Sequence, residues 1–150
     1  MGIPTPAVPR PGVISTPSLI GGLMTVEALT FGIASVVHLD VSVPLGFATI
    51  RGELFLAAAI PEAIIAGVLL AGAIAVLARP RGSWGVALTT TLFALTGVLL
   101  GLSALLSGPI SRSGDVTYHS TIFIAFLGTI ALLVTPAARR SMRRQPVRTG

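Results

Sequence analysis

The chain has 150 residues, of which 53% are apolar and only 10% are charged, whereas soluble domains carry about 25% charged residues. Its mean hydropathy of +0.92 excludes an ordinary soluble domain and predicts an all-α integral membrane protein, a multi-pass four-helix bundle of the plasma membrane. The net charge of +5 comes from arginines in loops and tails, so we expect no nucleic-acid partner. Cysteine is absent, which excludes disulfides and thiolate metal sites.

The first third of the chain is predicted to form a tail, one span and an interfacial loop. Residues 1–17 hold five prolines and two glycines, so we expect an irregular cytoplasmic tail. The first span is expected at about residues 18–39, with Glu27 inside it and His38 near its end. Residues 40–52 are apolar but too short to cross a membrane, so we expect them to lie in the outer interface or to form a re-entrant lid.

The second span, at about residues 53–78, carries a glutamate in its interior. It is long enough to cross a hydrocarbon core of about 30 Å at about 1.5 Å per residue, and Glu62 follows Pro61 near its middle. Ionisable residues at that depth are costly and usually face a bundle interior or a wet cavity. Because proline has no N–H, the carbonyl of Ala57 loses its helical partner, and we expect a kink and an unpaired carbonyl beside the Glu62 carboxyl.

The rest of the chain is predicted to form two more spans and a basic tail. Trp84 opens the third span, at about residues 84–106, and the fourth is expected at about residues 119–135. These two spans complete a transmembrane domain over residues 18–138. Residues 139–150 are rich in arginine and are expected to form a cytoplasmic tail.

Small residues predict where the helices approach one another. A GxxxG pair on the third span and a run of small residues at every fourth position of the second span both favour close helix contact. These residues are Gly97 and Gly101 on the third span and Ala59, Ala63, Gly67, Ala71 and Ala75 on the second.

The arginines predict that both termini lie in the cytoplasm. Eight of the ten arginines would then be cytoplasmic, and only Arg51 and Arg112 would lie in outer loops, which agrees with the known excess of positive charge in cytoplasmic loops. The arginine cluster after the last span could also bind anionic lipid headgroups, but a role as a topology anchor explains it more simply.

A first candidate site is a polar layer near the middle of the membrane. Counting residues from each interface places four side chains near one depth, and Thr30 shares a helix face with Glu27. Burial in hydrocarbon disfavours a charged carboxylate, and carboxyls in such surroundings can act as general acids. The alternative is that each glutamate only holds helices together through hydrogen bonds. The four side chains are Glu27, Glu62, Thr96 and Thr129.

A second candidate site lies at the outer mouth of the bundle. Polar residues open or close three of the predicted spans there, and two histidines among them could bind a metal together with carboxylates. The alternative is that these residues only cap helices and contact water. They are His38, Asp40, Arg51, Glu53, Asp115 and His119.

The same two histidines suggest a third possibility. His38 and His119 would lie at similar depth on antiparallel helices, so they could be axial ligands of a haem, with Arg51 and Arg112 near its propionates. The sequence leaves metal and haem binding open, and our main hypothesis assumes no cofactor.

These observations favour acid–base chemistry on a lipophilic small molecule, such as an isomerisation or a cyclisation. We expect Glu62 and Glu27 to be proton donor and acceptor and His38 or His119 to be a relay, while Thr30, Thr96, Thr129, Arg51 and Glu53 contact the substrate. The alternatives are a proton-coupled transporter or exporter and a non-catalytic subunit of a larger membrane complex. The expected partners are that small molecule, membrane lipid, and a second copy or a larger complex.

The arginine distribution generates a first prediction, about topology. Reporter fusions placed after Gly82 and at Gly150 should read as cytoplasmic, and a fusion within residues 111–114 should read as external, because arginine-rich segments are retained inside. Paired cytoplasmic and periplasmic reporters at the same positions would measure this. An external C-terminus would contradict the predicted orientation.

Overall fold

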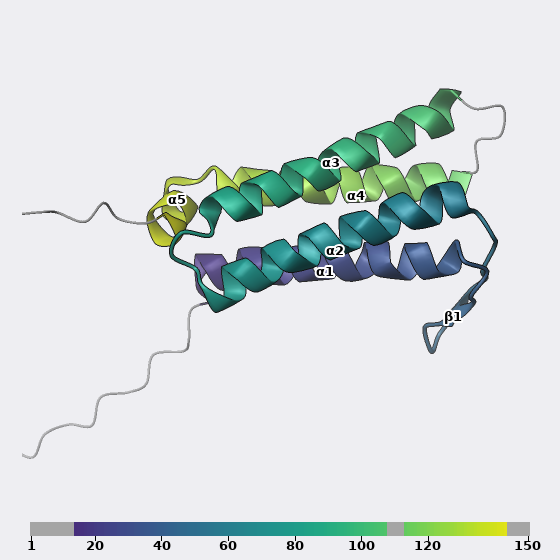
Figure 1. Ribbon diagram of the computed structural model, residues 1–150, viewed down its shortest axis with the longest axis horizontal. Helices are drawn as coiled ribbons and strands as arrows, with labels where there is room; N and C mark the ends of the chain where they lie inside the picture. The colour runs from purple at the N-terminus through teal and green to yellow at the C-terminus, as the bar shows by residue number, and fades with distance from the viewer. Residues whose placement is uncertain (1–13, 108–112, 144–150) are drawn as a thin grey trace, which may run out of the picture.

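The computed structural model describes residues 14–107 and 113–143 as four long antiparallel helices and a short fifth one. They are α1 (Thr16–Val37), α2 (Leu56–Ala78), α3 (Trp84–Ser107), α4 (Ser113–Leu133) and α5 (Pro136–Met142). Helix α1 packs along α2, α2 along α3, and α3 along α4, and α1 also contacts α4, which closes the bundle (Figure 1). The first four helices are long and apolar enough to cross a membrane. The predicted all-α four-helix bundle is therefore confirmed.

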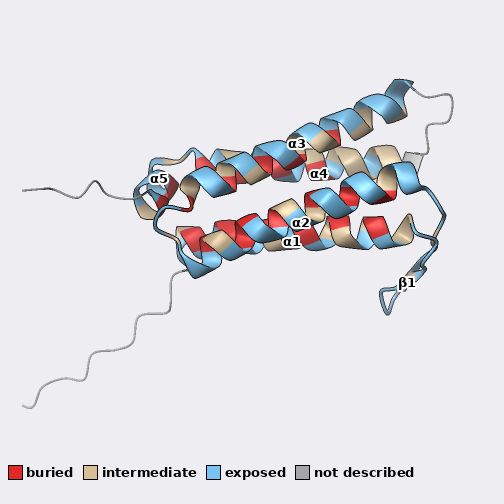
Figure 2. Cartoon of the chain, in the orientation of Figure 1, coloured by how far each residue is buried: buried red, intermediate tan, exposed pale blue. Residues whose placement is uncertain are grey.

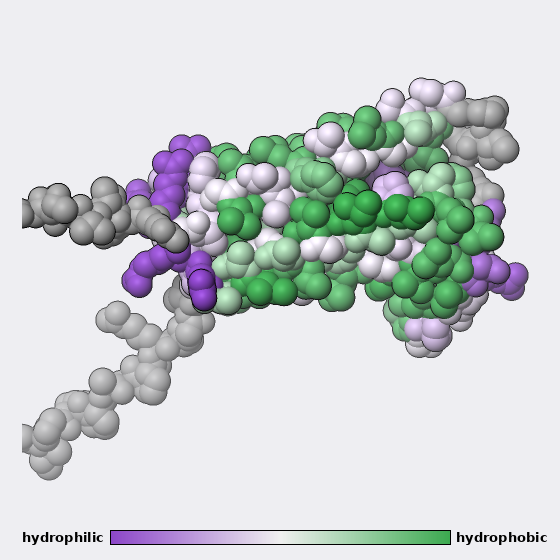
Figure 3. Space-filling view, viewed as in Figure 1, coloured by the Kyte–Doolittle hydropathy of each residue, from purple (hydrophilic) through white to green (hydrophobic). Residues whose placement is uncertain are grey.

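The two ends of the bundle differ. We call the end with α5 and the α2–α3 connection the arginine end, and the opposite end, with the α1–α2 connection, the hairpin end (Figure 1). Figure 3 shows hydrophobic side chains over most of the visible flank and hydrophilic ones gathered at the ends. That distribution suits a multi-pass membrane protein. Which end faces the cytoplasm stays a prediction.

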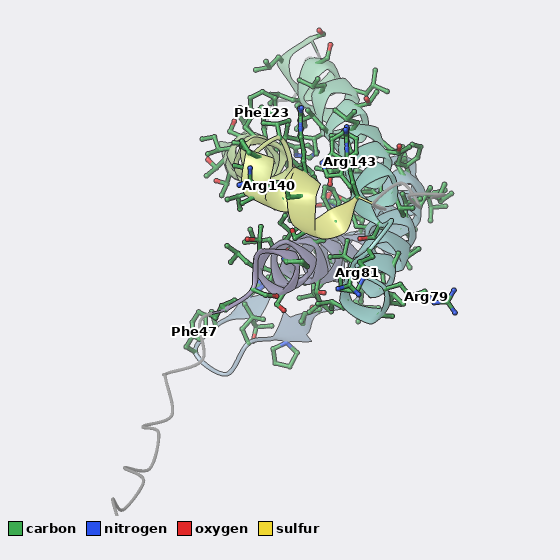
Figure 4. The ribbon with its side chains drawn as sticks, turned by 90° about the vertical axis from the view of Figure 1, so that its left-hand side faces the viewer. Phe47, Arg79, Arg81, Phe123, Arg140 and Arg143 are labelled. Atoms are coloured by element: carbon green, nitrogen blue, oxygen red, sulfur yellow. The ribbon has the colours of Figure 1, made fainter. Side chains whose placement is uncertain are left out.

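The hairpin end takes its name from two short strands, β1 (Val43–Pro44) and β2 (Thr49–Ile50), which pair in antiparallel fashion. A turn with positive φ at Gly46 connects them, and the tip carries Phe47, whose side chain is 89% exposed. Phe47 points away from the helices (Figure 4). The strands project from the side of the bundle, as an interfacial segment would. Both alternatives, an interfacial segment and a re-entrant lid, stay predictions.

Short α5 is an element that the sequence did not predict, because its residues fall in and beside the segment expected to be a basic tail. The Thr135 side chain accepts a hydrogen bond from the Ala138 N–H, and Pro136 follows the cap, which together start a helix. Ala138 and Met142 of α5 are fully buried in the bundle core. The Gly82 N–H also donates to the Met142 carbonyl, at 2.6 Å. The helix therefore closes the arginine end.

Trp84 connects α5 to the long helices α3 and α4. Its indole N–H donates to the Leu133 carbonyl at the end of α4, at 2.8 Å, and the Arg143 guanidinium lies over its ring, 4.2 Å from the centroid. Arg79, Arg81, Arg140 and Arg143 spread around the same end (Figure 4). Trp84 thus joins α3, α4 and α5, in addition to any interfacial role.

Close packing at the arginine-end half of the bundle depends on a glycine that the predicted small-residue run omits. A Cβ at Gly72 would lie 2.6 Å from Met24 Cε and would also overlap Thr90 Oγ1.

By contrast, Ala63, Gly67 and Ala71 are exposed, and a Cβ at Gly67 would meet nothing within 4 Å. The prediction that this run mediates helix contact is therefore wrong for these three residues, although Ala59 is buried.

The different surroundings of these glycines give a second prediction. Gly72→Ala should lower the free energy of unfolding by about 1–3 kcal/mol, because the added methyl overpacks the α2–α3 contact. The matched variant Gly67→Ala should leave stability unchanged or raise it by up to about 1 kcal/mol, the gain expected from alanine in a helix. Reversible unfolding in mixed detergent measures both. Equal effects of the two changes would contradict the packing described above.

Candidate functional site

A cavity of about 480 Å³ lies among the hairpin-end halves of the four long helices. Most of its wall is apolar, and four titratable side chains face it from three helices and their ends. Figure 3 shows a patch of polar atoms in the hollow between α2 and α3 toward this end. The cavity is lined by Phe31, His38, Phe55, Ala57, Ala58, Pro61, Glu62, Ile65, Gly97, Val98, Leu100, Gly101, Ala104, Leu105, Asp115 and His119.

The central polar contact of the cavity joins α1 to α2. His38 Nδ1 and Glu62 Oε2 are 2.7 Å apart, and the Glu62 side chain is almost completely buried. His38 is the residue that follows α1, and Glu62 lies in the second turn of α2. The Phe55 ring meets the imidazole edge to face, with centroids 5.9 Å apart. These neighbours fix the orientation of the His38 ring.

A second hydrogen bond holds the same two helices in register. Ser35, one turn before His38, donates from its hydroxyl to the Ala59 carbonyl at 2.8 Å, and the bond is buried. Helix α2 continues through Pro61, which lines the cavity. The Glu62 carboxyl, expected to lie beside the carbonyl of Ala57 that Pro61 leaves without a donor, contacts His38 through Oε2.

The opposite wall presents a second histidine, on α4. The His119 Nδ1 lies 2.9 Å from the Asp115 carbonyl oxygen of its own helix. A carbonyl can only accept, so Nδ1 carries a proton, and in the neutral ring Nε2 has a free lone pair. A Cβ on Gly101 would lie 2.8 Å from that Nε2. Glycine at this position therefore leaves the space that the imidazole occupies.

This placement depends on where α4 begins. The helix starts at Ser113, six residues before the predicted boundary of the fourth span, so Asp115 lies in its first turn and His119 one turn later. The Tyr118 ring packs edge to face against the imidazole, with centroids 5.1 Å apart. His38 and His119 thus reach one cavity from α1 and α4, as expected for antiparallel helices.

Metal binding at this site would depend on the two imidazoles. Each Nδ1 is engaged, by Glu62 or by the Asp115 carbonyl, which is how protein ligands of metals are commonly oriented. Across residues 14–107 and 113–143, however, no three His, Asp or Glu side chains come together closely enough to hold an ion. The haem and metal alternatives stay predictions. Arg112, assigned to a haem propionate, falls outside the described residues.

Glu27 belongs to a separate polar contact, deeper in the bundle. The Thr129 hydroxyl donates to Glu27 Oε1 at 2.7 Å across the α1–α4 interface, and both side chains are buried. Oε2 of Glu27 is buried without a hydrogen-bond partner in the described structure. Phe31 follows Glu27 by one turn, lines the cavity and stacks on Phe126, with centroids 6.0 Å apart. Glu27 itself does not line the cavity.

The two glutamates therefore do not form the single layer predicted from residue counting. Glu62 lies level with the end of α1, because it contacts His38, whereas Glu27 is near the middle of α1. Thr30 and Thr96 donate to the carbonyls of Val26 and Leu92 in their own helices. These two threonines are absent from both polar contacts.

Three predicted outer residues are also outside the cavity wall. Asp40, Arg51 and Glu53 lie in the α1–α2 connection and are exposed, and Glu53 donates its backbone N–H to the Val37 carbonyl at 2.9 Å.

Sequence reasoning missed the aromatic residues Phe31 and Phe55. The spacing of four and seven residues between Glu27, Phe31 and His38 was a signal that could have placed Phe31 on the site face.

Comparisons of this chain with protein-family models, with curated proteins and with solved structures found no match. The function must therefore be argued from the cavity itself.

The Glu27–Thr129 contact generates a third prediction. Thr129→Val should lower the free energy of unfolding by about 1 kcal/mol, because the change removes an interhelical hydrogen bond and leaves both carboxyl oxygens of Glu27 without a partner. Thr91→Val is the matched control, since Thr91 is equally buried but donates to Ala87 within its own helix. Unfolding in mixed detergent would compare them. An effect at Thr91 as large as that at Thr129 would contradict an interhelical role.

Proposed function

We propose that this protein is a plasma-membrane enzyme that moves a proton on a lipophilic small molecule, with His38 Nε2 as the base. The observation that carries this proposal is the 2.7 Å contact between His38 Nδ1 and Glu62 at the wall of the cavity. A carboxylate that accepts the Nδ1–H fixes the tautomer in which Nε2 has its lone pair, and it stabilises the imidazolium that forms when Nε2 takes a proton. Glu62 is then a positioning residue.

The step proposed is an allylic or keto–enol isomerisation. His38 Nε2 removes a proton from a carbon next to a carbonyl or a double bond, and the electron pair of the C–H bond moves into that π system. The imidazolium then returns the proton, at a different carbon in the allylic case or at the carbonyl oxygen in the keto–enol case, so the base is regenerated without a co-reactant. His119 faces the same cavity with its own Nε2 and orients a polar group of the substrate. This assignment gives Glu27 no part in the chemistry.

The substrate is lipophilic because the cavity lies among membrane-spanning helices and its wall is mostly apolar. A cavity with apolar walls and a few convergent polar groups is the usual form of a small-molecule site. Its volume of about 480 Å³ falls within the range of about 300–1,000 Å³ for such sites.

A proton-coupled transporter is the second candidate, and the position of Glu27 favours it. Glu27 Oε2 is buried without a hydrogen-bond partner among the described residues, and Glu27 does not line the cavity. Buried acids in membrane proteins commonly carry protons along a transport path. In that case Glu27 would be required, whereas the enzyme proposed above does not need it.

A hydrogen-exchange experiment tests the proposal without knowledge of the substrate, and this is our fourth prediction. Detergent-purified protein is incubated in D₂O with a lipid extract from membranes of the native host, and the extract is returned to H₂O, which removes deuterium from oxygen and nitrogen but not from carbon. Mass spectrometry should find a lipid that gains carbon-bound deuterium. His38→Gln and Glu62→Gln should each slow this gain by about 10²-fold or more, the usual contribution of a general base.

Glu27→Gln is the matched control and should exchange at the parental rate. Elution volume and thermal unfolding of each variant would show that it is folded. The transporter would replace the enzyme as the proposed function if two results came together. The parent protein would show no exchange, and proteoliposomes would take up a small molecule only with a proton gradient and with Glu27 present.

A further inference from the structure

We infer that the ligand of the cavity is a hydroxylated ring compound with a hydrocarbon tail, and that it enters sideways from the membrane through a slot between α2 and α3. This inference rests on the proposed function in one respect only, that the cavity binds a small molecule. It adds the route and the chemical class of that molecule.

We place the start of the slot beyond Gly97. At Gly97 itself α3 lies close to α2, since an added Cβ would be 2.5 Å from Ile65 Cδ1. Beyond Val98 no residue of α3 is buried. Figure 2 shows the same change, since α3 loses its buried residues over its last turns.

Small or apolar side chains form both edges of this slot. Ala57 and Pro61 on α2, and Leu100 and Ala104 on α3, line the cavity and are also exposed at the surface. Each of them therefore borders the cavity, with its titratable side chains, on one side and the lipid on the other. A hydrocarbon chain crossing here would exchange lipid contacts for apolar protein contacts at little cost, whereas a charged molecule would meet no polar partner in the slot.

The polar end of the ligand is specified by His119. Because Nδ1 donates to the Asp115 carbonyl, neutral His119 offers only an acceptor, at Nε2, to the cavity. A ligand carbonyl or ether oxygen cannot pair with an acceptor, but a hydroxyl can donate to it. Phe31 and Phe55 supply apolar faces for a ring beside this group. The matching ligand is a phenol, quinol or other ring alcohol.

Three probes and two variants test the inference in lipid nanodiscs, and this is our fifth prediction. The probes are a hydroquinone with a ten-carbon tail, its dimethyl ether, and the hydroquinone without a tail. The tailed hydroquinone should bind the parent protein, and the ether should bind at least about tenfold more weakly, because it has no hydroxyl to donate. Equilibrium binding of radiolabelled probes measures each affinity.

The variants locate the route. Ala104→Phe places a ring in the slot and should weaken the tailed hydroquinone by about tenfold or more while changing the tail-less one by less than about twofold. The matched control Ser103→Phe adds the same ring one residue earlier, at an exposed position that does not line the cavity, and should change neither affinity.

Three results would overturn the inference: no binding of the tailed hydroquinone, equal binding of its ether, or an equal loss of both hydroquinones in Ala104→Phe. The deuterium experiment fails or succeeds separately. Carbon-bound exchange on a lipid of the extract, without hydroquinone binding, would retain the enzyme and reject this ligand class. Slot-dependent binding of the tailed hydroquinone without any carbon-bound exchange would retain the ligand class and reject the isomerase.

Discussion

The contact between His38 and Glu62 is the constraint on which the hairpin end of the bundle depends. A carboxyl and an imidazole inside a membrane-spanning bundle would each be costly to bury alone, and breaking a buried pair leaves the remaining partner exposed to that cost. The contact therefore fixes how α1 and α2 align, and the Ser35–Ala59 hydrogen bond reinforces the same register. With α1 and α2 fixed, the position of α3 and the residue at which α4 begins decide the shape of the cavity.

The two buried glutamates are stabilised by different partners. Glu27 accepts a hydrogen bond from Thr129 in the packed interior and does not line the cavity. Glu62 is paired with a group that can itself exchange a proton, at the wall of a cavity. A threonine can stabilise a carboxyl but cannot take a proton from a substrate at neutral pH, whereas an imidazole can. The partner of each acid therefore favours the proposed chemistry at His38, which Glu62 positions, and helix association at Glu27.

Hydropathy alone was sufficient to predict the four-helix bundle, because an apolar run of about 20 residues has few alternatives in a membrane. Residue counting failed for the site. Depth along a span does not report which side chains meet. Glu27 and Glu62 were therefore grouped although they lie at different levels, and Thr30 and Thr96 were added although each donates only within its own helix. Helix α5 was missed because the arginines that predict a tail also lie on the exposed side of a short helix whose Ala138 and Met142 are buried.

The different closure of the two ends explains why a cavity can exist in so small a bundle. At the arginine end, Trp84 joins three helices and α5 fills the space between them, while Gly72 lets α2 approach α3 closely. These contacts stabilise the bundle without help from the last turns of α3. Those turns carry no buried residue beyond Val98, and the polar groups beside them are held in place by α1, α2 and α4. If the proposed ligand binds, stability and ligand access belong to opposite ends of the same four helices.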